Sequence, residues 1–419
     1  MIRFAVALIL LLNTTLLLAQ NQRDVVDSLK YQKDLQGILN DAVGRKLFDT
    51  IDRRHLYGFV LPFAVYNRNT GFSPGFYSFG GKTLGNPAST TFSILNAGAF
   101  LSFSGLPTIK IRHNIFTSDN QWNFVGTWLL GRTVAIDNGV GTGSKSQSDG
   151  NFTLNNVVFY NNAAAFLINY TYFTFNERAY RKITKHLYAG AGLGFDVYDN
   201  IIDPGTGNTT RSHNYTYSLR NGFSPSGYSA NGILFNFQYN SRDQPNRPYK
   251  GIYADLVLKV NQSWLGSERS AEQLKVEFRK YWSLSKTNPE TVIAFWSWSD
   301  YLLGGSVPYL DLPGNGSDDY GRTGRGYLPS RFKGRSFVYN EAELRFPITE
   351  NKLLSAVTFI NEETASSQNK IKLLQHWEPG TGAGLRLLFN KYTRSNICID
   401  YGQGNYGSKG LYLKVNEVF

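Results

Sequence analysis

The sequence predicts an all-β fold: a transmembrane antiparallel β-barrel of about 16 strands, preceded by a signal peptide and a short helical N-terminal segment. Three observations predict it. Aromatic residues make up 15% of the 419 residues, and 41 residues are Gly. The mean hydropathy is −0.30, and no apolar stretch reaches the length that a membrane-spanning helix needs. From about His55 onward, apolar and polar residues alternate with a period of two, as strands between lipid and a wet lumen require.

Residues 1–19 predict a secretory signal peptide. The basic Arg3 is followed by an apolar run over residues 4–18, which ends at the small Ala19. This run is too short to span a bilayer comfortably, and no cysteine at the cut indicates a lipid anchor. The only cysteine, Cys398, excludes an internal disulfide in an exported chain, so stability must come from elsewhere. A closed, hydrogen-bonded barrel would provide it.

Residues 20–55 predict a short periplasmic or lumenal segment ahead of the barrel domain, residues 56–419. The segment is polar and charged, with apolar residues at roughly helical spacing between Val25 and Leu47. This spacing favours one helix with a linker.

The strands that follow are recognised by alternation. In Leu187–Val197 and in Ile252–Asn261, one face is apolar and the other carries small or polar residues. Segments of this kind have predicted centres near residues 61, 76, 97, 112, 127, 168, 191, 234, 256, 278, 297, 341, 357, 385, 398 and 414. An even number of strands closes a barrel and leaves no sheet edge in lipid. The long connections, at about 135–161, 198–227, 304–335 and 362–380, are then all odd-numbered outer loops.

The predicted loop at about residues 304–335 carries the most informative motif of the chain. Gly324, Arg325, Gly326 and Tyr327 precede a strand that places Glu341 and Glu343 on its lumen side. We expect the Arg325 guanidinium to reach those carboxylates and to pair with Glu343, because Arg suits partly desolvated, bidentate pairing better than Lys does. The alternative interpretation is an arginine in open solvent, with Glu343 paired to Arg345 or to a neighbouring strand.

This segment, residues 321–348, resembles the inward-folded sixth extracellular loop and following strand of the Omp85 superfamily, the BamA/TamA-like outer-membrane barrels also described as bacterial surface antigens. The family usually has Val/Ile-Arg-Gly-Phe/Tyr, so Gly324 departs from the pattern. The motif also lies between the predicted strands eleven and twelve, where the family places it. In the family an Asp on the next strand completes the site. Here the aligned residue is Asn361, which implies a hydrogen bond with less charge.

Three further stretches carry the resemblance. Residues 240–251, NSRDQPNRPYKG, are similar to a periplasmic turn of the family, and residues 62–72, PFAVYNRNTGF, resemble the opening hairpin of short Bacteroidetes members without POTRA domains. The end of the sequence, DYGQGNYGSKGLYLKVNEVF, has an alternating last strand and Phe419, which resemble the C-terminal signal for barrel assembly.

The resemblance implies a protein of the outer membrane of a Gram-negative bacterium that inserts or translocates polypeptides, or lipids, without a cofactor. Residues 20–55 are too few for POTRA domains, so a POTRA-bearing or other assembly-machinery protein is a candidate partner. A passive pore or solute channel and an accessory subunit of a larger outer-membrane complex are the alternatives. The formal net charge of +12 fits outer-membrane lipids and lipopolysaccharide, and export argues against nucleic acid.

Other motifs do not support catalysis or metal binding. Gly71–Gly75 matches G-x-S-x-G, but Pro74 has no N–H to donate to an oxyanion. Gly139–Ser146 resembles a phosphate-binding loop, but no helix pattern follows, which favours a flexible outer loop. Three acids that could collect calcium lack the spacing of a calcium loop and predict a solvated acidic loop instead: Asp311, Asp318 and Asp319. We therefore expect no catalytic, cofactor-binding or metal-binding residue, and no enzyme.

Overall fold

The computed structural model describes residues 31–44, 57–67, 71–144, 151–159, 165–202, 211–368 and 371–419. The predicted signal peptide, residues 1–19, lies outside the described residues, as does most of the predicted segment 20–55.

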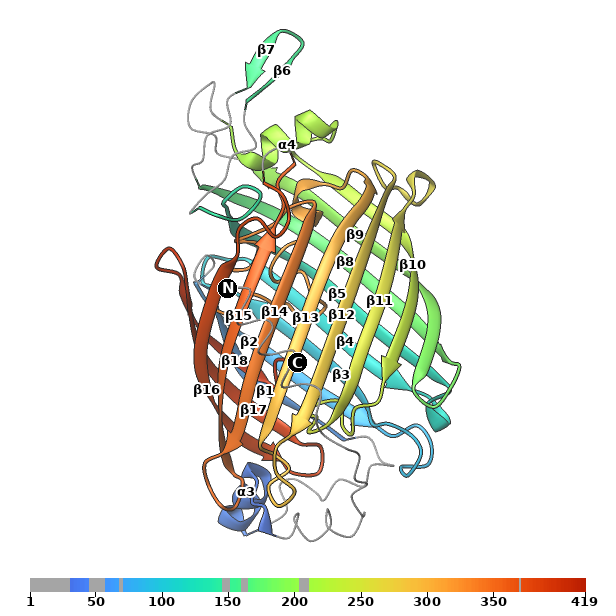
Figure 1. Cartoon of the computed structure of the whole chain (residues 1–419), viewed down its shortest axis with the longest axis vertical. Helices are drawn as coiled ribbons and strands as arrows, with labels where there is room; N and C mark the ends of the chain where they lie inside the picture. The colour runs from blue at the N-terminus through green and yellow to red at the C-terminus, as the bar shows by residue number, and fades with distance from the viewer. Residues whose placement is uncertain are drawn as a thin grey trace.

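One antiparallel sheet of 16 strands dominates the chain and curls into a barrel (Figure 1). Each of the 16 predicted centres falls inside one of these strands, so the predicted fold class is confirmed. The strands are β1 (Tyr57–Asn67), β2 (Gly71–Lys82), β3 (Ser93–Leu101), β4 (Pro107–Phe116), β5 (Trp122–Asp137), β8 (Phe166–Lys182), β9 (Leu187–Ile202), β10 (Tyr228–Asn240), β11 (Gly251–Asn261), β12 (Ala271–Ser283), β13 (Val292–Gly305), β14 (Ser336–Pro347), β15 (Leu354–Ala365), β16 (Glu378–Asn390), β17 (Ser395–Gly404) and β18 (Lys409–Val415).

Alternating side chains give the barrel its two faces. On β11, Leu256 is 38% exposed on the outside, whereas its neighbour Asp255 is 6% exposed and faces the lumen. The same alternation runs along β14, where every second residue from Phe337 to Arg345 is buried. Because successive side chains of a strand point to opposite faces, the period of two in the sequence translates directly into a lipid face and a lumen face.

The long connections gather at one end of the barrel (Figure 1). The connection between β9 and β10 contains the helix α4 (His213–Asn221), and the connection between β5 and β8 contains a hairpin of β6 (Phe152–Leu154) and β7 (Val157–Phe159). The sequence predicted neither of these elements, because both are too short for a periodic pattern to develop. No helix among the described residues is long and apolar enough to cross a membrane.

The described part of the loop with the phosphate-binding pattern is packed, so the predicted flexible loop is wrong for residues 139–144. The backbone N–H of Gly141 donates to the carbonyl oxygen of Lys333 at 2.7 Å, and that of Gly143 donates to Oε1 of Glu378 at 2.8 Å. Residues 145 and 146 lie outside the described residues. The other rejected motif, Gly71–Gly75, lies within β2 and forms no strand-to-helix turn.

A short helix, α3 (Leu35–Val43), lies at the end of the barrel opposite α4 (Figure 1). Asp34 begins it by accepting a hydrogen bond from the N–H of Gly37, and Gly44 ends it in the left-handed conformation. The same Asp34 accepts from the N–H of Lys391 at 2.9 Å, in the turn between β16 and β17. The described part of the N-terminal segment is therefore attached to the short-turn end of the barrel.

The two ends of the sheet differ from its interior. Hydrogen-bonded ladders connect the strands in chain order from β1 to β18, and among the described strands no ladder joins β18 to β1. The last strand, β18, ends at Val415, so Phe419 lies four residues beyond it. Asn416 has a positive φ of 66°, and the chain turns there so that residues 417–419 are buried in the barrel.

Candidate functional site

The connection between β13 and β14, residues 306–335, folds into the lumen and is tightened by its own side chains. Oδ1 of Asp318 accepts hydrogen bonds from the backbone N–H groups of Arg322 and Thr323, at 2.7 and 2.8 Å. Gly324 and Gly326 both have positive φ, of 84° and 110°, which favours glycine on each side of the arginine. The glycine flanks that mark the motif in the sequence therefore have a conformational cause.

The predicted solvated acidic loop is wrong. Asp318 is buried by the contacts just described, Asp319 pairs with Arg178 of β8, and Asp311 lies 3.8 Å from Nζ of Lys259. Burial tends to raise the pKa of Asp319, but the charge of Arg178 outweighs it and holds the pKa below its ordinary value. Asp311 and Asp319 therefore attach the loop to the barrel wall, and Asp318 holds the loop's own backbone.

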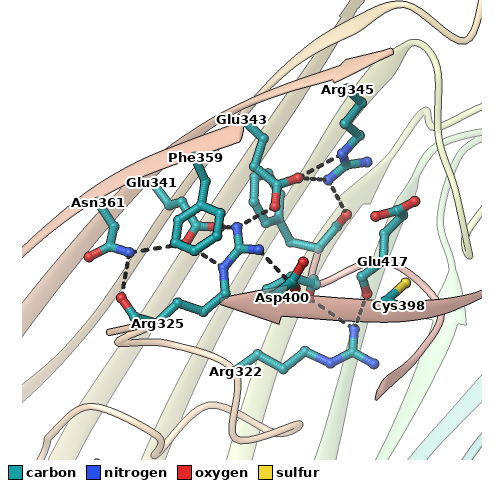
Figure 2. Close-up of polar contacts among 12 residues, drawn as sticks. Arg322, Arg325, Glu341, Glu343, Arg345, Phe359, Asn361, Cys398, Asp400 and Glu417 are labelled. Carbon is teal, nitrogen blue, oxygen red and sulfur yellow. Dashed lines mark hydrogen bonds and ion pairs between the residues drawn. The ribbon is translucent and has the colours of Figure 1, made fainter. Parts of the chain in front are cut away.

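The Arg325 side chain is fully buried among three carboxylates (Figure 2). Its Nε donates to Oε2 of Glu341 at 3.0 Å, its Nη2 contacts both Glu341 and Glu343, and its Nη1 donates to Oδ2 of Asp400 at 3.1 Å. The Phe359 ring centroid lies 3.6 Å from the guanidinium carbon. Three anions and an aromatic face thus compensate one desolvated cation.

The structure brings together Arg325 and Glu343, and it gives Asn361 a different role from the expected one. Nδ2 of Asn361 donates to the backbone carbonyl oxygen of Arg325 at 2.9 Å, so it holds the loop backbone and not the guanidinium. The third carboxylate comes from Asp400 on β17. Strand periodicity placed Glu341 on the lumen side with Glu343, whereas Asp400 was not predicted at the site. In the structure Glu341 shares the lumen face of β14 with Glu343, and no local pattern in the sequence marks Asp400.

The other motif residues fix the loop to the last three strands. The hydroxyl group of Tyr327 donates to the carbonyl oxygen of Pro379 at 2.6 Å and accepts from the N–H of Asn405 at 2.8 Å. The N–H of Gly326 donates to the hydroxyl group of Tyr412 on β18 at 2.9 Å. The loop therefore bridges β16 and β18.

Two further arginines extend the charge network beyond Arg325. Nη2 of Arg345 lies 2.5 Å from Oε2 of Glu343, and Nη1 of Arg386 lies 2.5 Å from Oδ1 of Asp400. Each of these carboxylates is therefore shared between Arg325 and a second arginine. Such sharing leaves Glu341 as the carboxylate that depends on Arg325 alone for an ion pair.

The buried residues after β18, residues 417–419, complete this network. Phe419 is 2% exposed, stacks on Trp296 with ring centroids 5.2 Å apart, and accepts a hydrogen bond from Arg345 at its carbonyl oxygen. Glu417 accepts from Nε of Arg386 at 2.7 Å. Burial would raise the pKa of Glu417, but Arg386 and two further arginines hold the pKa well below its usual range.

An antiparallel barrel of this kind, with an inward loop held in its lumen by a buried arginine, has the architecture of a transmembrane β-barrel protein. The Omp85 superfamily domain matches residues 121–390, which contain the loop, Arg325 and all of β14 and β15. The chain therefore belongs to the Omp85 superfamily, and this recognition from the sequence is confirmed.

A solved structure shares the fold. The chain is similar to BamA from Haemophilus ducreyi lacking POTRA domains 1–3, with 14% sequence identity and a TM-score of 0.52, over 86% of this chain and 69% of that chain. It is also similar to CdiB from Acinetobacter baumannii, with 11% identity and a TM-score of 0.48, over 86% of this chain and 59% of that chain. A search of curated proteins found no match.

Proposed function

We propose that this barrel inserts or translocates polypeptides at the outer membrane of a Gram-negative bacterium. The observation that carries the proposal is the boundary between β1 and β18, which no ladder joins among the described strands. Unpaired N–H and C=O groups at a sheet edge cost several kcal/mol each in lipid, and they are also a template for a new strand. Such an edge can pair with a strand of an incoming polypeptide.

The length of β18 supports this proposal. It has 7 residues, whereas its neighbour β17 has 10 and β16 has 13. A strand that crosses the membrane needs about 9–11 residues. On the other side of the boundary, Pro62 of β1 lacks an N–H group and removes one ladder donor. Both strands of the boundary are therefore less able than the others to pair along their whole length.

The inward loop supports the proposal from the lumen side. It contacts β18 through Gly326 and Tyr412 and is anchored to β14 and β17 through Arg325. The anchor allows the loop to support the last strand from within while the outer edge of that strand remains unpaired. Outer-membrane lipids and lipopolysaccharide would contact outward side chains such as Ile360 and Leu411, which are among the most exposed apolar residues. This role needs no cofactor and no catalytic residue.

The test is reconstitution of the purified protein into liposomes with a urea-denatured eight-stranded outer-membrane barrel as client. We expect the client to fold into a protease-protected, heat-modifiable form faster than in empty liposomes. Steady conductance without faster folding would favour the passive pore. If neither occurs, but affinity purification from native membranes recovers a POTRA-bearing protein, the accessory subunit is the better account.

A further inference from the structure

The lumen contains a cavity of about 350 Å³ that the loop and its anchor do not fill. It lies between the inner faces of β2–β4 and residues 318–322 of the inward loop, and β18 borders it. A cavity of this size is at the lower end of the range for sites that bind small molecules.

Positive charge exceeds negative charge around this cavity. Arg178 and Arg279 pair with acids that line it, and the lining Glu417 is occupied by Arg386. Within the described part of the chain, five other lining cations have no ion pair with a carboxylate: Lys110, Arg112, Arg242, Arg322 and Lys414. The remaining lining acid, Asp318, accepts hydrogen bonds from the loop backbone. The cavity therefore presents cations without counter-ions.

Three of these cations act on one another. Lys110 and Arg112 lie two residues apart on β4 and share its lumen face. Nε of Arg112 is shielded from solvent and has no hydrogen-bond partner among the residues that the structure describes. Burial lowers the pKa of Arg322, and the like charge of Arg112 lowers it further. An anion in the cavity would relieve this repulsion and give the Arg112 side chain an acceptor.

The last strand and the residues after it also border this cavity. All five residues from Leu413 to Glu417 line it. Lys414 on β18 therefore borders the same space as Arg112 of β4 and Arg322 of the inward loop.

We propose that this cavity is a binding site for a phosphate-bearing group, with Arg112, Arg322 and Lys414 as its direct ligands. Arg and Lys are the usual ligands of phosphate oxygens. The compact volume suits one headgroup better than an extended polypeptide segment. The phosphate belongs to a lipid headgroup or to free phosphate, which share this chemistry. The inference goes beyond the proposed function, because it rests on the cavity and on the charges that line it.

The test uses the full-length protein in detergent and isothermal titration with two probes, dihexanoyl phosphatidic acid and inorganic phosphate. The variant Arg112→Gln/Lys414→Gln removes two cavity charges. The control Arg181→Gln/Lys280→Gln removes the same charge away from the cavity lining. We expect the cavity variant to bind phosphatidic acid roughly 100-fold more weakly, about tenfold for each charge-assisted hydrogen bond that the variant cannot form, and the control to bind like the unmodified protein.

A second cavity variant, the single substitution Arg112→Gln, gives the same comparison with a loss of roughly tenfold if the first does not fold to the heat-modifiable form. Competition by inorganic phosphate supports the shared phosphate site, and binding of phosphatidic acid alone assigns the site to lipid. Equal affinities in cavity and control variants, or no binding at all, would overturn the proposal. Displacement of the lipid by hexaglutamate at lower concentration than by phosphate would assign the cavity to acidic polypeptide instead. Failure of the client-folding assay would leave this binding result unchanged.

Discussion

Replacing Arg325 with methionine removes the cation at the centre of the lumen network and leaves its three acids in place. Glu343 keeps Arg345 at 2.5 Å and Asp400 keeps Arg386 at 2.5 Å. Glu341 loses its ion pair and keeps only neutral partners. The variant therefore leaves one buried carboxylate, that of Glu341, without a compensating charge. The loss of stability arises from this carboxylate.

The expected magnitude follows from this geometry. Removing one member of a buried ion pair costs roughly 3–5 kcal/mol, and we expect Arg325→Met to lower the free energy of unfolding by about that amount. Adding Glu341→Gln removes the orphaned charge and should recover about 1–3 kcal/mol. Adding Glu343→Gln should recover less, because it deprives Arg345 of its carboxylate.

The assay is urea unfolding of the purified barrel, with folded and unfolded forms separated by gel mobility without boiling. Protease cleavage within residues 306–335 reports the position of the loop in the same samples. Arg181→Met on the exposed end of β8 is the control, expected within about 0.5 kcal/mol of the unmodified protein. Two results would refute the assignment of Glu341 as the acid that depends on Arg325. One is an equal recovery of unfolding free energy by Glu341→Gln and Glu343→Gln in the Arg325→Met background. The other is that the effect of each Gln substitution simply adds to the effect of Arg325→Met.

Three other predictions follow from single contacts. A Cβ on Gly326 would lie 2.8 Å from the carbonyl oxygen of Gln403, so Gly326→Ala should expose the loop to protease. The control is Gly407→Ala, because Gly407 also has a positive φ but a Cβ there would meet no atom within 4 Å, so this variant should not expose the loop. The pKa of Glu417 is depressed in the folded barrel, so its negative charge stabilises the fold at pH values above the ordinary pKa of a glutamate. This stabilisation is lost as the pH falls through the depressed pKa. The difference in urea midpoint between the unmodified protein and Glu417→Gln should therefore be constant from pH 8 to 5 and shrink below about pH 4. Asp34→Ala should cost about 1 kcal/mol at the α3 cap and speed proteolysis within residues 31–44.

The strands were predictable because the surroundings of a membrane barrel impose a local pattern. Each strand meets lipid on one face and the lumen on the other, so a period of two recurs in every strand, including β11 and β14. The pairing of Arg325 with Glu343 was expected from the resemblance and from strand periodicity. Both depend on residues close together in the sequence.

The rest of the site depends on contacts between distant residues. Asp400 is 75 residues from Arg325, and whether β15 or β17 supplies the third carboxylate is decided by how the loop enters the lumen. A Cβ on Gly404 would lie 2.3 Å from the Tyr327 ring, and one on Gly402 would lie 3.0 Å from the backbone N of Gly326. These glycines make room for the loop, a reason that only the folded barrel reveals.

The inward turn at Asn416 was missed for a similar reason. A single residue of positive φ reverses the chain, and the four residues from 416 to 419 are too few for a periodic pattern. Phe419 is apolar and fits a lipid face equally well by composition. No local pattern in the sequence predicts that it stacks on Trp296 of β13.

The boundary between β1 and β18 is where the proposed function is tested most directly. Cys398, which is buried and donates to the carbonyl oxygen of Asn416 at 3.2 Å, is first replaced by Ser, which keeps a donor. Single cysteines scanned along β1 are then combined with single cysteines along β18, and pairs that crosslink on oxidation are reconstituted with the urea-denatured client. The proposal predicts that the oxidised barrel loses its effect on client folding and regains it on reduction. Unchanged client folding by a demonstrably crosslinked barrel would contradict it.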